Sequence, residues 1–381
     1  MSRAPSPVNA TGASGAAGGW RVLVMAGVLT LAALGAYWNS LKVPFLLDDG
    51  ISIGDNPSIR HLGRIGDVFS PSPPAQTVAR PLLNLSLALN YAGGGMSVRG
   101  YHAVNLLIHI CAGLTLLGIV RRTLLWPDLR PRYGEVALPL AAAAALLWTL
   151  HPLQTESVTY ISQRAESLMG LFYLLTLYGF IRAVTAESHN CWLILSVAAG
   201  LCGMATKQVM VTAPVLVLLY DRAFVSGSFR ASWANRRWYY VSLAATWLWL
   251  GFLMHRSSLA AISVGFQSGV SWTAYALTEL RVVTNYLKLA FWPRPLVFDY
   301  GTEILATDPL TVALCALVLT AILVGVAIAW RRSPMAGFLG CWFFLILAPT
   351  STVVPIAEQP MAESRLYLPL AAVAALVTLL C

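Results

Sequence analysis

Charged residues are scarce in this chain. Asp, Glu, Lys and Arg make up 11% of the 381 residues, whereas hydrophobic residues make up 57%. The apolar residues are gathered into blocks rather than spaced at amphipathic intervals. A run of about 20 apolar residues crosses the bilayer as a helix, and the alternating pattern that a membrane barrel needs is missing. The sequence therefore predicts an all-α membrane protein with many spans.

Several functional motifs are also missing. The six cysteines have no paired spacing that would suggest a disulfide framework or a metal site. No Walker pattern is present, and the glycines at 93–95 lack the strand and helix that a dinucleotide loop requires. The net charge of +9 comes from short clusters between apolar blocks, where basic residues set membrane topology. We therefore expect no binding of nucleic acid.

The apolar blocks predict a bundle of about ten transmembrane helices. They cover residues 20–40, 103–120, 136–150, 167–184, 191–206, 208–220, 238–255, 310–330, 336–350 and 366–381. Residues 1–19 are rich in Ala, Gly, Ser and Pro and are expected to form a disordered tail. The first apolar block has no cleavage site after it and is interpreted as a retained signal anchor. Residues 20–381 would then form one membrane domain.

Basic clusters at alternate turns predict the topology by the positive-inside rule. On this assignment the opposite, extracytoplasmic face receives four segments, residues 43–102, 151–166, 256–309 and 351–365. The first is a long loop in which residues 58–70 could form a short amphipathic helix at the interface. Residues 278–296 are interpreted as an interfacial or re-entrant helix. Most of the unusual polar residues fall on this face.

Asp48 and Asp49 stand side by side in "FLLDDG", just after the first predicted span. Two adjacent carboxylates can repel one another enough to raise the pKa of one of them. A raised pKa suits a general base that removes a proton from an alcohol. The alternative is an ordinary turn, because Asp before Gly is common in turns.

A second polar group lies in "HPLQTESVTYISQRAES", where the third span should emerge. It supplies His151, Glu156, Arg164 and Glu166. On a continuous helix Glu156 and Arg164 would lie on nearly one face. A structural salt bridge between Arg164 and either glutamate is the alternative, and His151 could simply cap a helix end.

The third group is basic and lies on the predicted outer face, against the positive-inside trend. Arg80, Lys207 and Arg365 belong to it, and Glu363 and Tyr367 flank Arg365 in "AESRLYLPL" as further candidates for binding the donor. Basic residues on that face suggest an anionic ligand, and arginine binds phosphate oxygens with two parallel hydrogen bonds. The alternative for Lys207 is snorkelling towards the headgroups.

Six motifs in order resemble one known family. They are "FLLDDG" with "DNPSI", "RPLLNLSLALNYAGGGMSVRGYHAVNLLIHI", "HPLQTESVTYISQRAESL", "MATKQVMVTAPVLVLLYDR", "RVVTNYLKLAFWPRPLVFDY" and "AESRLYLPL". Over residues 43–370 the chain resembles the polytopic GT-C glycosyltransferases of the TMTC type, relatives of the protein O-mannosyltransferases. The resemblance implies a GT-C-like bundle with a long first extracytoplasmic loop that carries short interfacial helices.

The resemblance also implies a function. Such an enzyme takes a sugar, mannose above all, from a polyprenyl phosphate and gives it to a hydroxyl, often a protein Ser or Thr. The catalytic base in the first outer loop maps to Asp48 or Asp49, with a small preference for Asp48, and the acidic second loop maps to Glu156 and Glu166. Gln208 stands where the family has an acid, and the tetratricopeptide repeats of eukaryotic members are absent, so a protein, glycan or lipid acceptor stays open.

These residues suggest a mechanism. One aspartate would accept the proton of the attacking hydroxyl, while Arg365, with Arg80 or Lys207, would stabilise the departing lipid phosphate. A single displacement inverts the sugar, and Mg or Mn between Asp48, Asp49 and the phosphate is a further option.

The rival hypothesis is a transporter or flippase of the lipid-linked sugar, although no internal repeat favours it. The site would face the bacterial periplasm, or the endoplasmic reticulum lumen in a eukaryote.

Overall fold

The computed structural model describes residues 14–71, 77–257, 271–301, 308–351 and 359–380, and those residues contain helices and no strands. The α-helices are α1 Ser14–Tyr37, α2 Ile65–Phe69, α3 Pro81–Gly94, α4 Val98–Leu124, α5 Arg130–Tyr133, α6 Ala137–Thr149, α7 Gln154–Thr159, α8 Arg164–Thr185, α9 His189–Met204, α10 Ala213–Tyr220, α11 Phe229–Ser257, α12 Trp272–Phe291, α13 Pro309–Arg332, α14 Pro334–Leu347 and α15 Leu370–Leu380. Short 3₁₀ or π turns include η4 Ile161–Gln163, η5 Gln208–Thr212, η6 Asp221–Val225 and η7 Glu363–Leu366.

Each of the ten predicted apolar segments overlaps one of these helices. Five helical segments are long and apolar enough to cross a membrane, namely Gly19–Lys42, Val98–Leu124, Ile161–Thr185, Gln208–Val225 and Pro309–Arg332. Helices α6, α9, α14 and α15 are apolar but shorter. The chain is therefore a multi-pass membrane protein, and a count of about ten spans stays a prediction.

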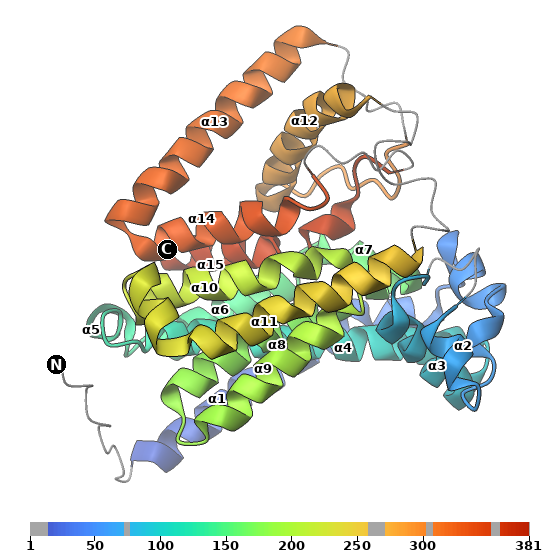
Figure 1. The fold of residues 1–381 in the computed structure, drawn as a ribbon, viewed down its shortest axis with the longest axis horizontal. Coiled ribbons are helices and arrows are strands. Elements are labelled where there is room, and N and C mark those ends of the chain that lie inside the picture. Colours follow the sequence, from blue (N-terminus) through green and yellow to red (C-terminus); the bar gives the residue numbers. More distant parts are fainter. Residues whose placement is uncertain (1–13, 72–76, 258–270, 302–307, 352–358, 381) are drawn as a thin grey trace.

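The helices form a bundle with two distinct ends (Figure 1). The short helices α2 and α3 of the first loop lie at one end, and α5 lies at the other, whereas α12 and α13 slant away from the rest. The Arg222 guanidinium of η6 lies 4.7 Å from the centroid of the Trp330 ring, which precedes Arg331 and Arg332 at the end of α13. Two of the basic clusters used for the predicted topology are therefore neighbours, and the orientation in the membrane stays a prediction.

The N-terminal segments follow the predictions in part. Residues 1–13 of the predicted disordered tail lie outside the described residues, and residues 14–19 already belong to α1. In the predicted amphipathic stretch 58–70, the helix α2 covers only Ile65–Phe69. The first loop therefore consists of α3, several short helical turns and connecting chain.

A buried asparagine holds the first loop together. The Asn84 side chain, on α3, is fully buried and accepts hydrogen bonds from Asn56 and Thr77 at 3.0 and 2.9 Å. It donates to the Ser58 hydroxyl and the Val68 carbonyl at 2.9 and 2.8 Å. Since all its polar atoms are paired, this network fixes the loop at low desolvation cost. The described segments of the loop around Asn56, Val68 and Thr77 are thus tied to α3.

A close helix contact sets the position of η7, which carries part of the candidate site. A Cβ atom added at Gly170 of α8 would lie 2.6 Å from the Tyr367 ring. The ring is buried, and its hydroxyl lies 3.0 Å from Nδ1 of His109, so it has little freedom to retreat. Gly170 therefore lets the chain after η7 pack directly on α8.

We expect Gly170→Ala to lower the free energy of unfolding by about 1–3 kcal/mol, because overpacking a filled interior forces side chains from their rotamers. Gly27→Ala on α1 is the matched control, since a Cβ there meets nothing within 4 Å. Thermal unfolding in detergent measures both. A Gly170→Ala protein at least as stable as the control would contradict this account.

Candidate active site

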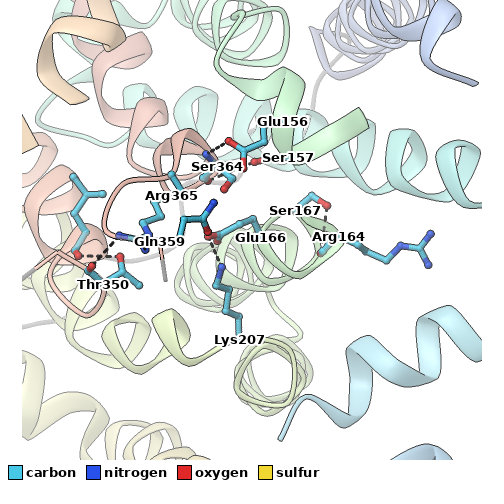
Figure 2. Close-up of polar contacts among 12 residues, drawn as sticks. Glu156, Ser157, Arg164, Glu166, Ser167, Lys207, Thr350, Gln359, Ser364 and Arg365 are labelled. Carbon is cyan, nitrogen blue, oxygen red and sulfur yellow. Dashed lines mark hydrogen bonds and ion pairs between the residues drawn. The ribbon is translucent and has the colours of Figure 1, made fainter. Parts of the chain in front are cut away.

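The segment between α6 and α8 is bent, which separates Glu156 from Arg164. Tyr160 is extended (φ −84°, ψ 114°) between α7 and η4. Glu156 therefore lies on α7, whereas Arg164 and Glu166 lie in the first turn of α8 (Figure 2). The expectation of one continuous helical face for Glu156 and Arg164 is wrong, because the chain turns between them.

A buried ion pair lies at the start of α8. The Lys207 ammonium lies 2.5 Å from Oε1 of Glu166, and the Glu166 side chain is 3% exposed (Figure 2). Lys207 stands between α9 and η5 in extended backbone conformation. The ammonium points to a carboxylate rather than to the headgroups, so snorkelling does not describe this lysine.

Two more cations approach the same carboxylate. Arg80 and Arg365 both interact electrostatically with Glu166, and both act on Lys207 as well. Arg80 comes close because the Leu82 amide donates a hydrogen bond of 3.1 Å to the Ala205 carbonyl, which joins the start of α3 to the end of α9. Of the three basic residues that the sequence singled out, Lys207 is paired with Glu166, and Arg80 and Arg365 are close enough to act on it electrostatically.

Backbone carbonyls hold the Arg365 guanidinium in place. It donates to the carbonyls of Thr350, Pro360 and Gln359 at 3.2, 2.8 and 2.5 Å (Figure 2). Its side chain is buried, and it lines a narrow cleft with Glu166. A planar cation fixed in this way is preorganised for an anion.

Glu156 ties α7 to η7. Its Oε2 accepts a hydrogen bond of 2.8 Å from the Ser364 amide (Figure 2). Burial raises the pKa of Glu156 to about 7, and the carboxylates of Glu363 and Glu166 also raise it, while the bonds to Ser364 oppose the shift. Glu156 therefore positions the backbone next to Arg365.

The paired aspartates have different environments. Asp49 is buried and accepts three hydrogen bonds, from the Leu46 amide at 3.0 Å and from the Ser162 amide and hydroxyl at 2.7 and 2.5 Å. Burial raises the pKa of Asp49, and these bonds oppose the shift. Asp48 is half-buried, its amide donates to the Tyr160 hydroxyl at 2.9 Å, and its carboxylate acts on the same hydroxyl.

Asp49 thus anchors the first loop to the segment that enters α8. Ser162 precedes Glu166 by four residues, about one helical turn. This anchor leaves the neighbouring Asp48 carboxylate more exposed, at the same end of the bundle as Glu166.

Arg164 lies away from this cluster. Its fully buried guanidinium donates to the Asn105 side chain at 2.6 Å and to the carbonyls of Ser86 and Tyr101 at 3.2 and 3.0 Å. It points away from Glu166 in Figure 2. Neither glutamate pairs with it, so the alternative of a structural salt bridge also fails. Arg164 holds α3, α4 and α8 together.

Three other candidates also have structural partners. Tyr367 lies in the core, where its carbonyl accepts from the Trp148 indole at 2.7 Å. Glu363 accepts from the Val297 amide and the Tyr300 hydroxyl at 2.7 and 2.8 Å. His151 follows α6, and its Nδ1 accepts from the Leu153 amide at 3.3 Å, as expected of a cap. Among the described contacts none of their side chains bonds to Glu166 or Lys207, although Tyr367 is close enough to interact electrostatically with Glu166.

Sequence reasoning missed Glu279 on α12. Its carboxylate is 3% exposed and interacts electrostatically with Arg365. The signal was present, because Tyr275, Glu279, Val282 and Tyr286 follow helical spacing and all four are buried. A carboxylate in an otherwise apolar stripe marks a buried charge.

The described residues do not form a ready metal site. They hold no group of three or more His, Cys, Asp or Glu side chains that could bind a metal ion. Asp49, one of the two suggested ligands, already uses both oxygens in hydrogen bonds.

Comparison with known proteins adds independent information. Residues 97–255 match the family model of dolichyl-phosphate-mannose-protein mannosyltransferases. The chain is 30% identical over 308 residues to protein O-mannosyl-transferase Tmtc1 of Drosophila melanogaster. The aligned region covers 73% of this chain and 34% of that relative. The resemblance to the TMTC-type protein O-mannosyltransferases is confirmed.

Two further TMTC-type comparisons agree. Identity to TMTC4 of Homo sapiens is 29% over 229 residues, or 55% of this chain and 30% of the relative. Identity to F38B6.6 of Caenorhabditis elegans is 26% over 357 residues, or 87% and 48%. The chain therefore spans less than half the length of each of these relatives. No solved structure matches the chain.

We expect Asp49→Ala to lower the free energy of unfolding by about 1–3 kcal/mol, because it leaves the buried donors of Ser162 unpaired. Asp48→Ala should cost less, since the Asp48 carboxylate is half-buried and acts on a single hydroxyl, that of Tyr160. Thermal unfolding of both variants in detergent tests this difference. Equal losses of stability would refute the division of roles.

Glu156 should make stability depend on pH. Its pKa rises from 4.5 to about 7 on folding, so the folded state binds more protons than the unfolded state between these values. Stability from this group is therefore present below about pH 4.5 and is lost as the pH rises towards 7. Glu156→Gln should remove this slope, and thermal unfolding from pH 5 to 8 measures it. A wild-type curve parallel to that of the variant would contradict the assignment.

Proposed function

We propose that this protein transfers mannose from a polyprenyl-phosphate carrier to a hydroxyl acceptor. The observation that carries the proposal is the convergence of Arg80, Lys207 and Arg365 on Glu166, at the bundle end where Asp48 lies. Three cations beside Glu166, with Glu279 acting on Arg365 as well, suit a phosphate that arrives with its own negative charge. The matching family of mannosyltransferases supports the sugar and the reaction class.

Asp48 is the proposed general base. Its carboxylate would take the proton of the acceptor hydroxyl as that oxygen attacks the anomeric carbon of the sugar. Asp48 is more exposed than Asp49 and can therefore meet an incoming acceptor. Asp49 would hold Asp48 in position through Ser162 rather than react itself.

The leaving group is the lipid phosphate. The bond between the anomeric carbon and the phosphate oxygen breaks as the new glycosidic bond forms, so negative charge grows on the phosphate. Arg365 and Arg80 would stabilise this charge, and Lys207 would do so while paired with Glu166. A single displacement inverts the configuration at the anomeric carbon.

The acceptor and the membrane face belong to the same proposal. The relatives are named protein O-mannosyltransferases, which favours a protein hydroxyl over a glycan or lipid hydroxyl. The basic α5 end would face the cytoplasm, which places the site on the extracytoplasmic side. Membrane lipids would surround α1 and α13, whose exposed apolar side chains include Leu31 and Leu317.

Purified protein incubated with labelled polyprenyl-phosphate-mannose and hydroxyl-bearing peptides tests the proposal. We expect transfer by the wild type and a loss of about 10²–10⁴-fold in kcat for Asp48→Asn, the range for general-base catalysis. Asp55→Asn is the matched control, because Asp55 is an exposed acid in the same loop. The product should carry the inverted linkage.

The basic cluster has its own test in the same assay. Arg80→Gln should raise the KM for the donor, whereas Arg99→Gln, at an exposed position of α4, should not. Equal turnover by wild type and Asp48→Asn would overturn the base assignment. Donor binding with no transfer to any acceptor would favour the transporter hypothesis instead.

A further inference from the structure

Glu279 differs from the other buried carboxylates. Neither of its oxygens accepts a hydrogen bond within the described part of the chain. The other carboxylates buried there each accept at least one, and they are Asp49, Glu166, Asp221 and Glu363. Buried polar groups in native proteins are nearly always paired, so a buried carboxylate without a donor suggests that a ligand supplies one.

Other polar groups surround this carboxylate. The hydroxyls of Tyr275 and Ser351 and the guanidinium of Arg365 all act on Glu279. The Ser351 hydroxyl is buried and also lacks a hydrogen-bond partner in the described structure. The Tyr275 hydroxyl donates a hydrogen bond of 3.5 Å to the Thr350 carbonyl, so the hydroxyl oxygen of Tyr275 can still accept one.

Glu279 and Arg365 face each other without an ion pair. The direct ion pairs between described residues are Lys207–Glu166 and Arg236–Asp221. The Glu279 carboxylate can accept a hydrogen bond, and the Arg365 guanidinium can donate one. A ligand group between them would therefore have to donate to Glu279 and accept from Arg365. A sugar hydroxyl does both.

Arg365 links Glu279 to the cluster of Glu166, Lys207 and Arg80. Arg365 interacts electrostatically with Glu166 and with Glu279. A donor phosphate beside Arg365 would therefore have its attached sugar within reach of α12. Glu279 would then be the side chain that meets this sugar, on a helix that otherwise packs through Tyr275, Val282 and Tyr286.

We propose that Glu279, assisted by Ser351 and Tyr275, binds a hydroxyl of the donor sugar and selects for it. This inference rests on the proposed function, since the sugar is that of the polyprenyl-phosphate donor. The Glu279 carboxylate accepts the hydrogen bond of the sugar hydroxyl, and the Ser351 hydroxyl donates to the oxygen of the same group.

The test compares kcat/KM for polyprenyl-phosphate-mannose with kcat/KM for each of its monodeoxy analogues. A site built to bond a hydroxyl rejects the analogue that lacks it, by at least about 100-fold. We expect wild type to reject one analogue in this way and Glu279→Ala to accept it within about 10-fold of the full donor. Glu279→Gln should give an intermediate ratio, and Ser351→Ala a smaller change with the same analogue.

A merely structural role would lower kcat/KM for all donors by one factor and leave the ratio unchanged, and that result would overturn the inference. Glu187→Ala, at an exposed position between α8 and α9, is the control. If Glu279→Ala does not fold, Glu279→Gln and Ser351→Ala decide the question. Wild type that transfers no sugar at all would instead overturn the proposed function, together with the inference that depends on it.

Discussion

The buried pair of Glu166 and Lys207 is the interaction on which the polar end of this bundle depends. Three cations near one another would repel, and an isolated buried charge is costly to bury. Glu166 holds Arg80, Lys207 and Arg365 together, and Glu279 acts on Arg365 as well, so three cations face two carboxylates. The cluster is therefore stable enough to fold and keeps an attraction for an anion. The same basic side chains that pair with Glu166 are thus the ones proposed to bind the phosphate.

Residues of one type divide their roles across the structure. Asp49 is saturated with hydrogen bonds and holds the first loop, whereas its neighbour Asp48 is left more exposed. Arg164 is buried among carbonyls and holds helices together, whereas Arg365 reaches the cleft beside Glu166. In each pair one residue holds structural elements together, and the other has its charged group at the proposed site. Preorganisation of this kind lets charged groups act without first rearranging.

The sequence predicted the helices well because long apolar runs in a bilayer have few alternatives. It also put Arg80, Lys207 and Arg365 on one predicted membrane face, and all three act on Glu166, while their binding of an anion stays a prediction. It could not predict the bend at Tyr160, because no Pro or Gly marks it and long-range bonds to the first loop stabilise it. Residue type alone did not place the Arg164 side chain or reveal Glu279, since both depend on the direction of a helix face.

The distances along the chain between the contacting segments also order the assembly of the protein. Glu166 and Lys207 are 41 residues apart, whereas Glu156 and Ser364 are 208 apart. A chain made from its N-terminus presents the first pair long before η7. The Glu166–Lys207 ion pair can therefore form before Arg365 is made, and Arg365 joins a cluster whose first two charges are already paired.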